Sequence, residues 1–474
     1  MLNVLSAITL PFIGEVTLST SLLIVFIICL IAVVGFEFVN GFHDTANAVA
    51  TVIYTKALKP VYAIPWSGTF NFLGVFLGGV AVAMGILKLL PLDELMKLPV
   101  AVGACMVLAV LLASIIWNLG TWYLGIPCSS SHTLIGAMIG ASIAFTWYYG
   151  GAGVNWDKAK EIGLSLILSP LIGFGAAAGL MYLLIHVIKW KALFHIPENE
   201  NDTPPILIRL LLITTCTLVS FFHGSNDGQK GVGLLMLILI AFLPAKFAVN
   251  HAIHNDKILS SLNKTEQVFM HINPTGAESK ALLLRTDSAI EKTKTLLTSK
   301  NPADTAKTYK FRKQVKSVGS GITALLAAKD IKWQNKDRET VKSASKDITG
   351  LTDFAPIWVI ATISISLGIG TMVGWKRIVV TIGEKIGNQH LNYAQGASSE
   401  LVAAATIGLS SSFGLPVSTT HVLSSGIAGS MLASGGAGNL NSKTLKNIAL
   451  AWVLTLPVAI ILAFLLFLFF HLFI

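Results

Sequence analysis

Charged residues are scarce in this chain of 474 residues, since Asp, Glu, Lys and Arg make up only 12% of it, against roughly 25% in an ordinary soluble domain. Hydrophobic residues make up 53%, and the mean hydropathy is +0.71. Windows of 18 or more residues carry no charge, for example 19–36, 101–125 and 448–470. Because about 20 apolar residues cross a bilayer as a helix, this composition excludes a soluble domain and predicts about ten to twelve crossings.

Paired cysteines are lacking as well. The four cysteines stand singly in apolar segments, without a CxxC: Cys29, Cys105, Cys128 and Cys216. We interpret them as small buried hydrophobes, and we expect neither a bound metal centre nor a cofactor. A basic region before the first apolar run is also missing, so we expect that run to be a retained span rather than a cleaved signal peptide.

Basic charge is concentrated in one stretch. The net charge is +10, and residues 246–353 hold 19 Lys/Arg and 11 Asp/Glu. Because most of the surplus belongs to one polar loop, it gives no reason to expect a nucleic-acid partner. A basic loop between spans is typical of the cytoplasmic side, although the rule is weaker for long loops. Apolar residues at roughly helical spacing predict that part of this loop is helical.

Two motifs occur twice, in the same order. GIPCSSSHT (125–133) matches GLPVSTTHV (414–422) at an offset of 289, and GFHDTANA (41–48) matches GSNDGQKG (224–231) at an offset of 183. The difference of 106 residues is close to the length of the basic stretch. The loop therefore resembles an insertion into the second copy of a duplicated membrane unit, and duplicated halves with polar breaks are typical of transporters with a site between the repeats.

The duplication divides the chain into three parts. Residues 1–245 hold the first membrane repeat and the start of the second, which begins near residue 205. Residues 246–353 form the basic loop, which we expect to be cytoplasmic and partly helical. Residues 354–474 complete the second repeat.

The hydroxyl motif predicts a helix that begins inside the membrane. Proline lacks an N–H and disfavours helix in the residue before it, so Pro127 and Pro416 mark breaks. Serine is a good N-cap, and the free N–H groups of a helix start bind anions. We therefore predict a site for a tetrahedral oxyanion, lined by the hydroxyls of both motifs: Ser129, Ser130, Ser131, Ser418, Thr419 and Thr420.

A purely structural role is the alternative for this motif. Serine and threonine often pack membrane helices, and Gly136 with Gly140 supplies a helix-packing pattern nearby. The duplication together with proline favours the binding interpretation. The two motif histidines stay open, because His132 and His421 can either brace the broken helices or titrate near neutral pH.

The upstream motifs place charges inside the membrane. Asp44 with Asn47, and Asp227 with Lys230, are spaced i, i+3 and share a helix face. An ionisable group at the bilayer centre costs about 2.5 to 3.5 kcal/mol, so such residues mark ion or substrate pathways. Simple neutralisation of Asp227 by Lys230 is the alternative, and it leaves Asp44 unexplained. We predict that Lys230 attracts the anion and that four residues serve a coupling ion: Asp44, Asn47, Asn226 and Asp227. The candidate proton carriers are His43, His132, His223, His421 and Glu37.

At GFHDTANAVAT, HGSNDGQKG, GIPCSSSHT and GLPVSTTH the sequence resembles the inorganic phosphate transporter (PiT) family, in particular its bacterial low-affinity permeases. The resemblance covers roughly residues 20–250 and 355–474. It implies an all-α polytopic membrane protein with about twelve transmembrane helices in two inverted repeats, each with a re-entrant helical hairpin. It also implies a large cytoplasmic loop and external termini, phosphate on the motif hydroxyls, and a coupling ion at Asp44 and Asp227.

Two departures from the family pattern bear on coupling. Sodium-coupled members resemble GxNDxANA in both copies, whereas here His43 replaces the first asparagine and Lys230 replaces the last asparagine of the second copy. An ammonium in an amide position repels Na⁺. We therefore expect phosphate import by proton symport and alternating access in the plasma (inner) membrane, with phosphate entering as a neutral divalent metal complex, as the permeases imply. Sodium coupling and a homodimeric state stay open.

Two other functions remain as alternatives. A transporter of sulfate or another oxyanion would use the same donors. An intramembrane hydrolase would use Ser131 or Ser225 with one of the histidines, but nothing resembles a nucleophile elbow, and one active site needs one nucleophile rather than two copies of a motif. We therefore predict a transporter and not an enzyme.

Overall fold

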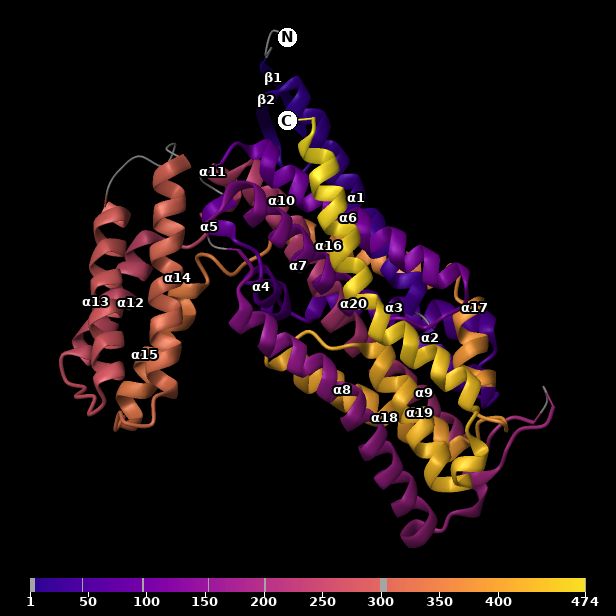
Figure 1. The fold of residues 1–474 in the computed structure, drawn as a ribbon. Helices are drawn as coiled ribbons and strands as arrows, with labels where there is room; N and C mark the ends of the chain where they lie inside the picture. Colours follow the sequence, from indigo (N-terminus) through magenta and orange to yellow (C-terminus); the bar gives the residue numbers. More distant parts are fainter. Residues whose placement is uncertain are drawn as a thin grey trace. The chain divides into compact units, whose positions relative to one another are not determined.

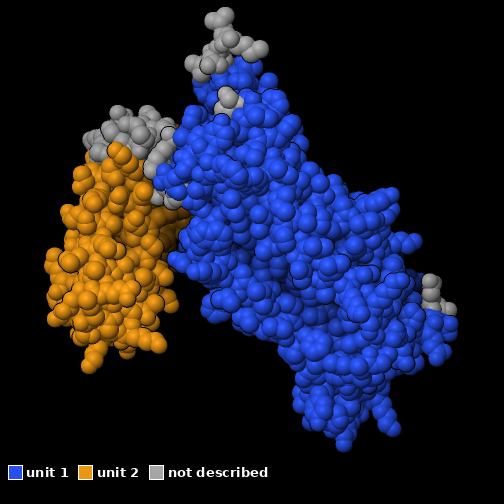
Figure 2. Space-filling view, viewed as in Figure 1, with its two compact units in different colours: residues 1–238, 356–474 blue, residues 239–355 orange. Residues whose placement is uncertain are grey.

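The structure, a computed structural model, describes residues 5–44, 46–95, 98–151, 153–199, 202–298 and 305–473. Thr45 of the first motif lies outside these residues. The chain forms two compact units: unit 1 is Met1–Ile238 with Pro356–Ile474, and unit 2 is Leu239–Ala355 (Figure 2). Unit 1 contains all the repeated motifs.

A β-hairpin precedes the first membrane helix. Its antiparallel strands are β1 (Leu5–Leu10) and β2 (Gly14–Ser19). The tight turn between them holds Phe12 at φ 62° and Gly14 at φ 78°, a region that suits glycine. The sequence analysis did not predict this hairpin.

Five helical segments of unit 1 are long and apolar enough to cross a membrane, or seven if two bent helix pairs each count as one span. This agrees with a polytopic membrane protein, while the count of about twelve spans stays a prediction. Several other helices are short or rich in Ser, Thr and Gly, which lowers their hydropathy. The five segments are α1 with α2 (Thr20–Asp44, Ala46–Tyr54), α6 (Val100–Tyr123), α8 with η1 (Trp156–Leu183, Leu184–Ile188), α9 with η3 and α10 (Ile206–His223, Gly224–Gly228, Gln229–Phe242), and α20 (Ser442–His471).

Each bent pair breaks at a glycine with positive φ. Helix α3 (Pro60–Leu77) turns by 72° into α4 (Ala81–Leu87) at Gly79, where φ is 81°. Helix α16 (Ile357–Thr371) turns by 57° into α17 and η4 (Lys376–Val380, Thr381–Lys385) at Gly374, where φ is 72°. Glycine takes this conformation without a Cβ penalty, so the local sequence sets both bends.

Two helical hairpins carry the hydroxyl motifs (Figure 1). Helix α6 is followed by α7 (Ser130–Tyr149), and α18 (Tyr393–Ser412) is followed by α19 (Thr419–Gly435). The predicted N-caps are confirmed, since Ser129 Oγ accepts from the His132 N–H and Ser418 Oγ accepts from the His421 N–H, both at 3.1 Å. The short 3₁₀ helices η2 (Lys191–Phe194) and η5 (Ala437–Asn439) lie in connecting segments, and α5 is Leu92–Leu95.

Glycines let the second arm of each hairpin pack closely on a long helix. A Cβ at Gly140 would lie 2.0 Å from the Ile460 carbonyl oxygen on α20, and one at Gly429 would lie 2.2 Å from the Phe174 carbonyl oxygen on α8. Such approaches exclude any side chain at these positions. The glycine pattern noted in the sequence therefore packs helices, while the hydroxyls at the start of α7 point elsewhere.

The helices of unit 1 begin and end at two opposite faces. We call the face with the N-terminal hairpin the terminal face and the opposite one the basic face. At the terminal face Phe12 stacks on Trp358, at the start of α16, with 6.4 Å between ring centroids. The basic face holds Ala57, whose carbonyl accepts from Arg209 Nε at 2.9 Å, at the start of α9. The segment α1–α2 thus runs from the terminal to the basic face, and α9–α10 runs back.

Helix α20 also ends at the terminal face. It starts at the basic face, where the Asn441 N–H donates to Ile386 O at 2.9 Å and Tyr54 Oη donates to nearby Glu384 at 2.8 Å. Its 30 residues cover about 45 Å, and Figure 1 draws both chain termini at one end of unit 1. The N-terminal hairpin, the C-terminus and both connections to residues 239–355 therefore share one face.

Unit 2 is helical, with helices α11 (Pro244–Phe247), α12 (Asn255–Phe269), α13 (Ala277–Thr298), α14 (Thr305–Ala327) and α15 (Asn335–Thr349). Its core contains Ile258, Leu262, Ile322 and Val341. The buried Arg312 guanidinium donates to the Ala248 and Thr352 carbonyls at 2.5 and 3.1 Å, which fastens both ends of the unit. Burial lowers the pKa of Arg312 to about 10.

Candidate functional site

The end of α1 presents the first aspartate to the second hydroxyl motif. Asp44 Oδ1 accepts a hydrogen bond from Thr420 Oγ1 at 2.9 Å, and Thr420 Oγ1 accepts from Asn47 Nδ2, also at 2.9 Å. Asn47 lies 3.4 Å from Asp44, as expected for residues on one helix face. His43 Nδ1 contacts the Asp44 carboxylate at 3.2 Å. The first repeat's acid is therefore bonded to the second repeat's hydroxyl.

The second aspartate lies in a π-helical turn. Residues Gly224–Gly228 form η3 between α9 and α10, and such turns often occur at functional sites. Asp227 pairs with Lys230 Nζ at 2.8 Å, and both side chains are buried. Asn226 Nδ2 donates to Ser411 and to the Leu415 carbonyl at 3.0 and 3.1 Å, which holds the turn against the second hairpin.

Lys230 links the second repeat to the first hydroxyl motif. Its ammonium donates to Ser131 Oγ, and Ser131 Oγ donates to the Val417 carbonyl of the second motif at 2.7 Å. Together with the Asp44 to Thr420 bond, this makes the contacts crosswise: each upstream motif touches the hydroxyl motif of the other copy. The two hairpin tips meet at the same buried place.

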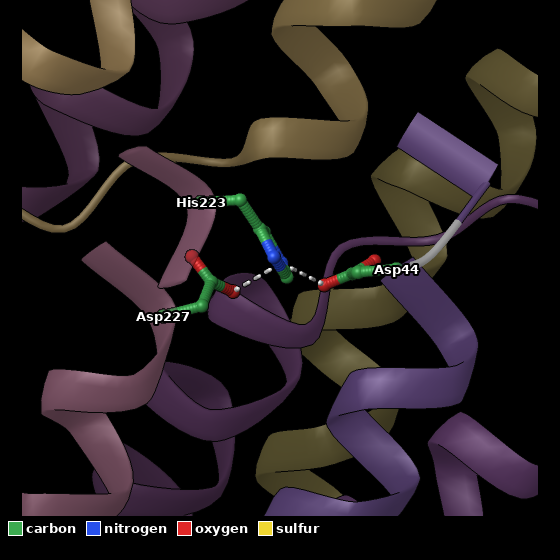
Figure 3. A group of neighbouring side chains, drawn as sticks. All are labelled: Asp44, His223 and Asp227. Carbon is green, nitrogen blue, oxygen red and sulfur yellow. Dashed lines mark ion pairs between the residues drawn. The ribbon is translucent and has the colours of Figure 1, made fainter. Parts of the chain in front are cut away.

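His223 connects the two aspartates (Figure 3). Its Nε2 lies 3.7 Å from Asp44 Oδ2 and 3.9 Å from Asp227 Oδ2, while its Nδ1 contacts Asn71 Oδ1 at 2.8 Å. The ligand atoms of Asp44, His223 and Asp227 all lie within 4.8 Å of one another, which suits a bound cation. The same arrangement can hold a proton shared between a histidine and two carboxylates.

The remaining hydroxyls divide into helix caps and free donors. Ser129 and Ser418 are occupied as N-caps. Ser130 Oγ is buried and has no hydrogen-bond partner among the described residues, and such a group calls for an explanation. Together with the N–H groups at the starts of α7 and α19, Ser130 and Thr419 leave donors for an anion.

The two motif histidines stack at the hairpin tips. The rings of His132 and His421 are 4.5 Å apart, and His421 stacks on Trp452 at 3.9 Å. His132 Nδ1 also contacts Ser129 Oγ at 2.8 Å. This geometry supports the bracing interpretation, since both rings pack against the helix starts.

Comparison with known proteins gives the family. The family model of the phosphate transporter family matches residues 40–463. The low-affinity inorganic phosphate transporter of Buchnera aphidicola subsp. Acyrthosiphon pisum (strain APS) is 42% identical over 93% of this chain and 95% of its own length. The chain belongs to the phosphate transporter family. The low-affinity inorganic phosphate transporter PitA of Escherichia coli (strain K12) is 40% identical, over 94% of this chain and 96% of its own.

A solved structure shares the fold of this family member. The sodium-dependent phosphate transporter matches 95% of this chain and 100% of its own, with a TM-score of 0.55 and 21% identity. The relatives matched by sequence are named as transporters and not as enzymes. At the site, Ser131, a serine of the hydrolase alternative, bonds Lys230 and the Val417 carbonyl, and no hydrogen bond joins it to a histidine among the described residues.

Every predicted site residue except the half-buried His132 is buried. Most converge at the hairpin tips, and Glu37 lies about two helical turns before Asp44 on α1. Its side chain bonds Asn40 Nδ2 at 3.3 Å and packs where Gly231 lacks a side chain, with a Cβ there only 2.3 Å from Glu37 Oε1. Glu37 therefore lies beside the helical turn that holds Gly231 and Lys230, and it does not reach the motif hydroxyls.

Sequence analysis missed one buried acid. Glu400 lies in α18, fully buried, and accepts hydrogen bonds from Thr51 and, at 2.5 Å, from Thr215. The signal was present, since Glu400 is the sole charge between residues 386 and 442. Asn71, which contacts His223, gave no comparable signal, because a lone amide in an apolar helix is not distinctive.

Proposed function

We propose that the protein imports inorganic phosphate by alternating access, with phosphate bound between the starts of α7 and α19. The observation that carries this proposal is the meeting of both hydroxyl motifs in one buried site, where Lys230 reaches Ser131 and Asp44 holds Thr420. Membership of the phosphate transporter family supports the substrate. The buried Ser130 hydroxyl and the two helix starts supply the donors that a desolvated oxyanion needs.

Proton coupling is the second part of the proposal. Lys230 is fixed beside Asp227 at 2.8 Å, and its positive charge opposes Na⁺ at that carboxylate. His223 lies between the two aspartates and His43 contacts Asp44, so both imidazoles are placed to pass a proton to or from a carboxylate. Glu37, His132 and His421 lie close enough to contribute. Lys230 opposes a divalent cation at Asp227 as it opposes Na⁺, so a cation accompanying phosphate would find its carboxylate and imidazole ligands at Asp44 and His223.

Sodium coupling is the second candidate. The sodium-dependent phosphate transporter shares the fold, and the oxygens of Asp44, Asn47 and Thr420 are hard ligands of the kind Na⁺ uses. Counterflow of labelled phosphate in proteoliposomes, with Na⁺ and pH varied separately, decides between the two. Proton coupling predicts stimulation by an inward pH gradient without Na⁺, and dependence on Na⁺ would overturn it. Sulfate as a competitor tests the substrate in the same assay.

Ser130→Ala with Thr419→Ala tests the phosphate site. We expect uptake to fall at least tenfold, because two donors to a buried anion are lost and each charge-assisted hydrogen bond contributes about 1.5 to 3 kcal/mol. Ser142→Ala with Ser430→Ala is the matched control, since these buried hydroxyls lie on the same two helices away from the tips. Equal uptake by both double variants, at equal amounts in the membrane, would refute the assignment.

Two inverted repeats with re-entrant hairpins are our proposal for the architecture. Matching elements follow in the same order, namely α1–α2 with α9–α10, α3–α4 with α16–α17, α6–α7 with α18–α19, and α8 with α20. The first pair runs in opposite directions between the two faces, as inversion requires. We place the protein in the plasma (inner) membrane.

The orientation follows from the short connections. Those at the basic face carry ten Lys and Arg, whereas those at the terminal face carry three among the described residues: Lys88, Lys158 and Lys160. Short loops rich in Lys and Arg lie in the cytoplasm, and long polar segments have little influence. We therefore propose that the terminal face is external, and with it unit 2. The ten cationic residues at the basic face are Lys56, Lys59, Lys189, Lys191, Arg209, Lys376, Arg377, Lys385, Lys443 and Lys446.

This proposal keeps the predicted external termini and competes with the sequence-based prediction of a cytoplasmic loop, which stays a prediction. Asn263 of unit 2 and Asn388 at the basic face are exposed. In a variant without native cysteines, a membrane-impermeant maleimide added to intact cells should label Asn263→Cys but not Asn388→Cys. The reverse pattern would return unit 2 to the cytoplasm.

A further inference from the structure

A cationic cavity opens at the tip of the first hairpin, apart from the central site. It has a volume of about 590 Å³ and lies between the end of α6 and the α17–η4 segment. Its lining includes Trp122, Tyr123 and three exposed cations, Lys376, Arg377 and Lys385. Small-ligand sites have volumes of about 300 to 1,000 Å³. We call this cavity the arginine pocket.

The charge of the arginine pocket is not compensated within its lining, which contains no carboxylate. The nearest acid in the sequence, Glu384, is outside the lining and accepts from Tyr54 Oη at 2.8 Å. No ion pair is formed by Lys376, Arg377 or Lys385 among the described residues. Three positive charges around one cavity therefore favour an anionic ligand.

Arg377 is held in place rather than free in solvent. Its guanidinium carbon lies 5.2 Å from the Trp122 ring centroid and 5.0 Å from that of Tyr123, and Nη1 donates to the Tyr123 carbonyl at 2.6 Å. Trp122 is fixed in turn, because its Nε1 donates to the Gly374 carbonyl at 2.8 Å. A planar guanidinium with a fixed orientation and spare N–H donors is suited to phosphate oxygens.

The equivalent place on the second hairpin is closed and apolar. Gly414, the counterpart of Gly125 in the motif, packs on α4, where a Cβ would lie 3.1 Å from the Ala81 carbonyl oxygen. The neighbouring α4 residues Val82, Ala83 and Ile86 are fully buried. The cations thus belong to one hairpin alone, so they are not a requirement of the repeated fold.

From these observations we propose that the arginine pocket binds a phosphate group, a ligand site separate from the central one. Two sources carry this group: free phosphate, and the headgroup of an anionic phospholipid. The exposed Tyr123, Leu124 and Val373 beside the pocket offer apolar surface to an acyl chain, whereas free phosphate needs the cations alone.

The site also adjoins the hairpin tip. Gly125, the first residue of GIPCSSSHT, lines the pocket, and its carbonyl accepts from Thr381 Oγ1 of η4 at 2.8 Å. A ligand held by Lys376, Arg377 and Lys385 ties α17–η4 to the segment that leads into Ser129 and Ser130. Occupancy therefore acts on the start of the first hydroxyl motif.

Binding to the purified full chain in detergent tests the proposal without relying on transport. The probes are dihexanoylphosphatidylglycerol, dihexanoylphosphatidylcholine as the neutral control, and radiolabelled inorganic phosphate in equilibrium dialysis. The test variant is Lys376→Gln with Arg377→Gln and Lys385→Gln. The matched control is Lys189→Gln with Lys191→Gln and Lys443→Gln, which removes the same charge from the same face outside the pocket.

We expect binding of one anionic probe to weaken on the order of 100-fold in the test variant, at about fivefold or sixfold per lost cation, and to persist in the control. Loss of phosphatidylglycerol binding identifies the lipid as the source, and loss of a second phosphate site identifies free phosphate. Either supports the proposal. Equal binding of both probes by test and control variants overturns it.

A second variant tests whether any loss of binding comes from misfolding, since Arg377 also packs on two aromatic rings. Lys376→Gln with Lys385→Gln keeps the arginine and changes only exposed side chains. It should bind about 30-fold more weakly than the wild type, with an unchanged thermal unfolding midpoint. Unchanged binding in this variant would also contradict the proposal.

Discussion

The buried ion pair between Lys230 and Asp227 allows a quantitative test of the site. Both side chains are about 1% exposed, and the charged atoms are 2.8 Å apart. The perturbation is Lys230→Met, which keeps the length of the side chain and removes its charge. Asp227 is then left as a buried carboxylate without its partner.

The expected cost is large for one residue. Breaking a buried pair by removing one partner destabilises a protein by about 3 to 5 kcal/mol, whereas replacing both partners by neutral groups is often close to neutral. Asp227→Asn with Lys230→Met should therefore recover most of the loss, and the double-mutant cycle should give a coupling of about 3 kcal/mol. The lost Lys230 to Ser131 bond adds about 1.5 to 3 kcal/mol.

Chemical unfolding in detergent measures these differences. A partly exposed pair at almost the same distance, Lys158 and Glu161 at 2.7 Å with side chains 14% and 51% exposed, is the control cycle, and it should couple by no more than about 1 kcal/mol. Phosphate uptake by the stable double variant should stay low, because the anion has lost its cation. If the coupling energy of the Asp227–Lys230 cycle is no larger than that of the Lys158–Glu161 cycle, the argument that burial strengthens this ion pair is refuted.

Three further predictions concern packing and unit 2. Gly140→Val should abolish membrane accumulation, because a Cβ there would lie 2.0 Å from the Ile460 carbonyl oxygen; immunoblots of membranes measure it. Arg312→Met should destabilise unit 2 by about 2 to 4 kcal/mol, seen as faster proteolysis within residues 239–355, because two buried carbonyls lose their donor. Hydrogen bonds from Ser279 and the Gly276 N–H lower the pKa of Asp330. Its stabilisation is present above the unfolded value of about 3.9 and is lost as pH falls through the lower folded value, so Asp330→Asn should reduce amide protection at the start of α13 at pH 7 and by progressively less as the pH is lowered below about 3.9.

Local chemistry made the hairpin tips predictable. Pro127 and Pro416 break the chain, and Ser129 and Ser418 cap the following helices as expected. Each of these features depends on a few neighbouring residues, so the sequence is sufficient. The i, i+3 spacing placed Asp227 and Lys230 on one helix face, and their mutual neutralisation was the alternative interpretation; the two side chains do pair.

Long-range contacts were not predictable in the same way. Nothing in the spacing predicts that Asp44 bonds Thr420 of the other copy, or that Lys230 bonds Ser131, since each upstream motif also contacts its own hydroxyl motif, through His43 to Cys128 and through Asn226 to the Leu415 carbonyl. Tertiary packing makes that choice. Glu400 was detectable as a lone charge, but its partners Thr51 and Thr215 come from two other helices.

The crosswise contacts bear directly on the transport cycle. Any motion of one repeat against the other must change the Asp44 to Thr420 bond, the Lys230 to Ser131 bond, or both, because each joins an upstream motif to the hairpin of the other copy. In the proposed cycle, a bound phosphate would compete for the same hydroxyls, and a proton on Asp44 would weaken the carboxylate as the acceptor from Thr420. Substrate and coupling ion would then act on the same bonds that join the two repeats, which is the physical condition under which binding can drive a change in access.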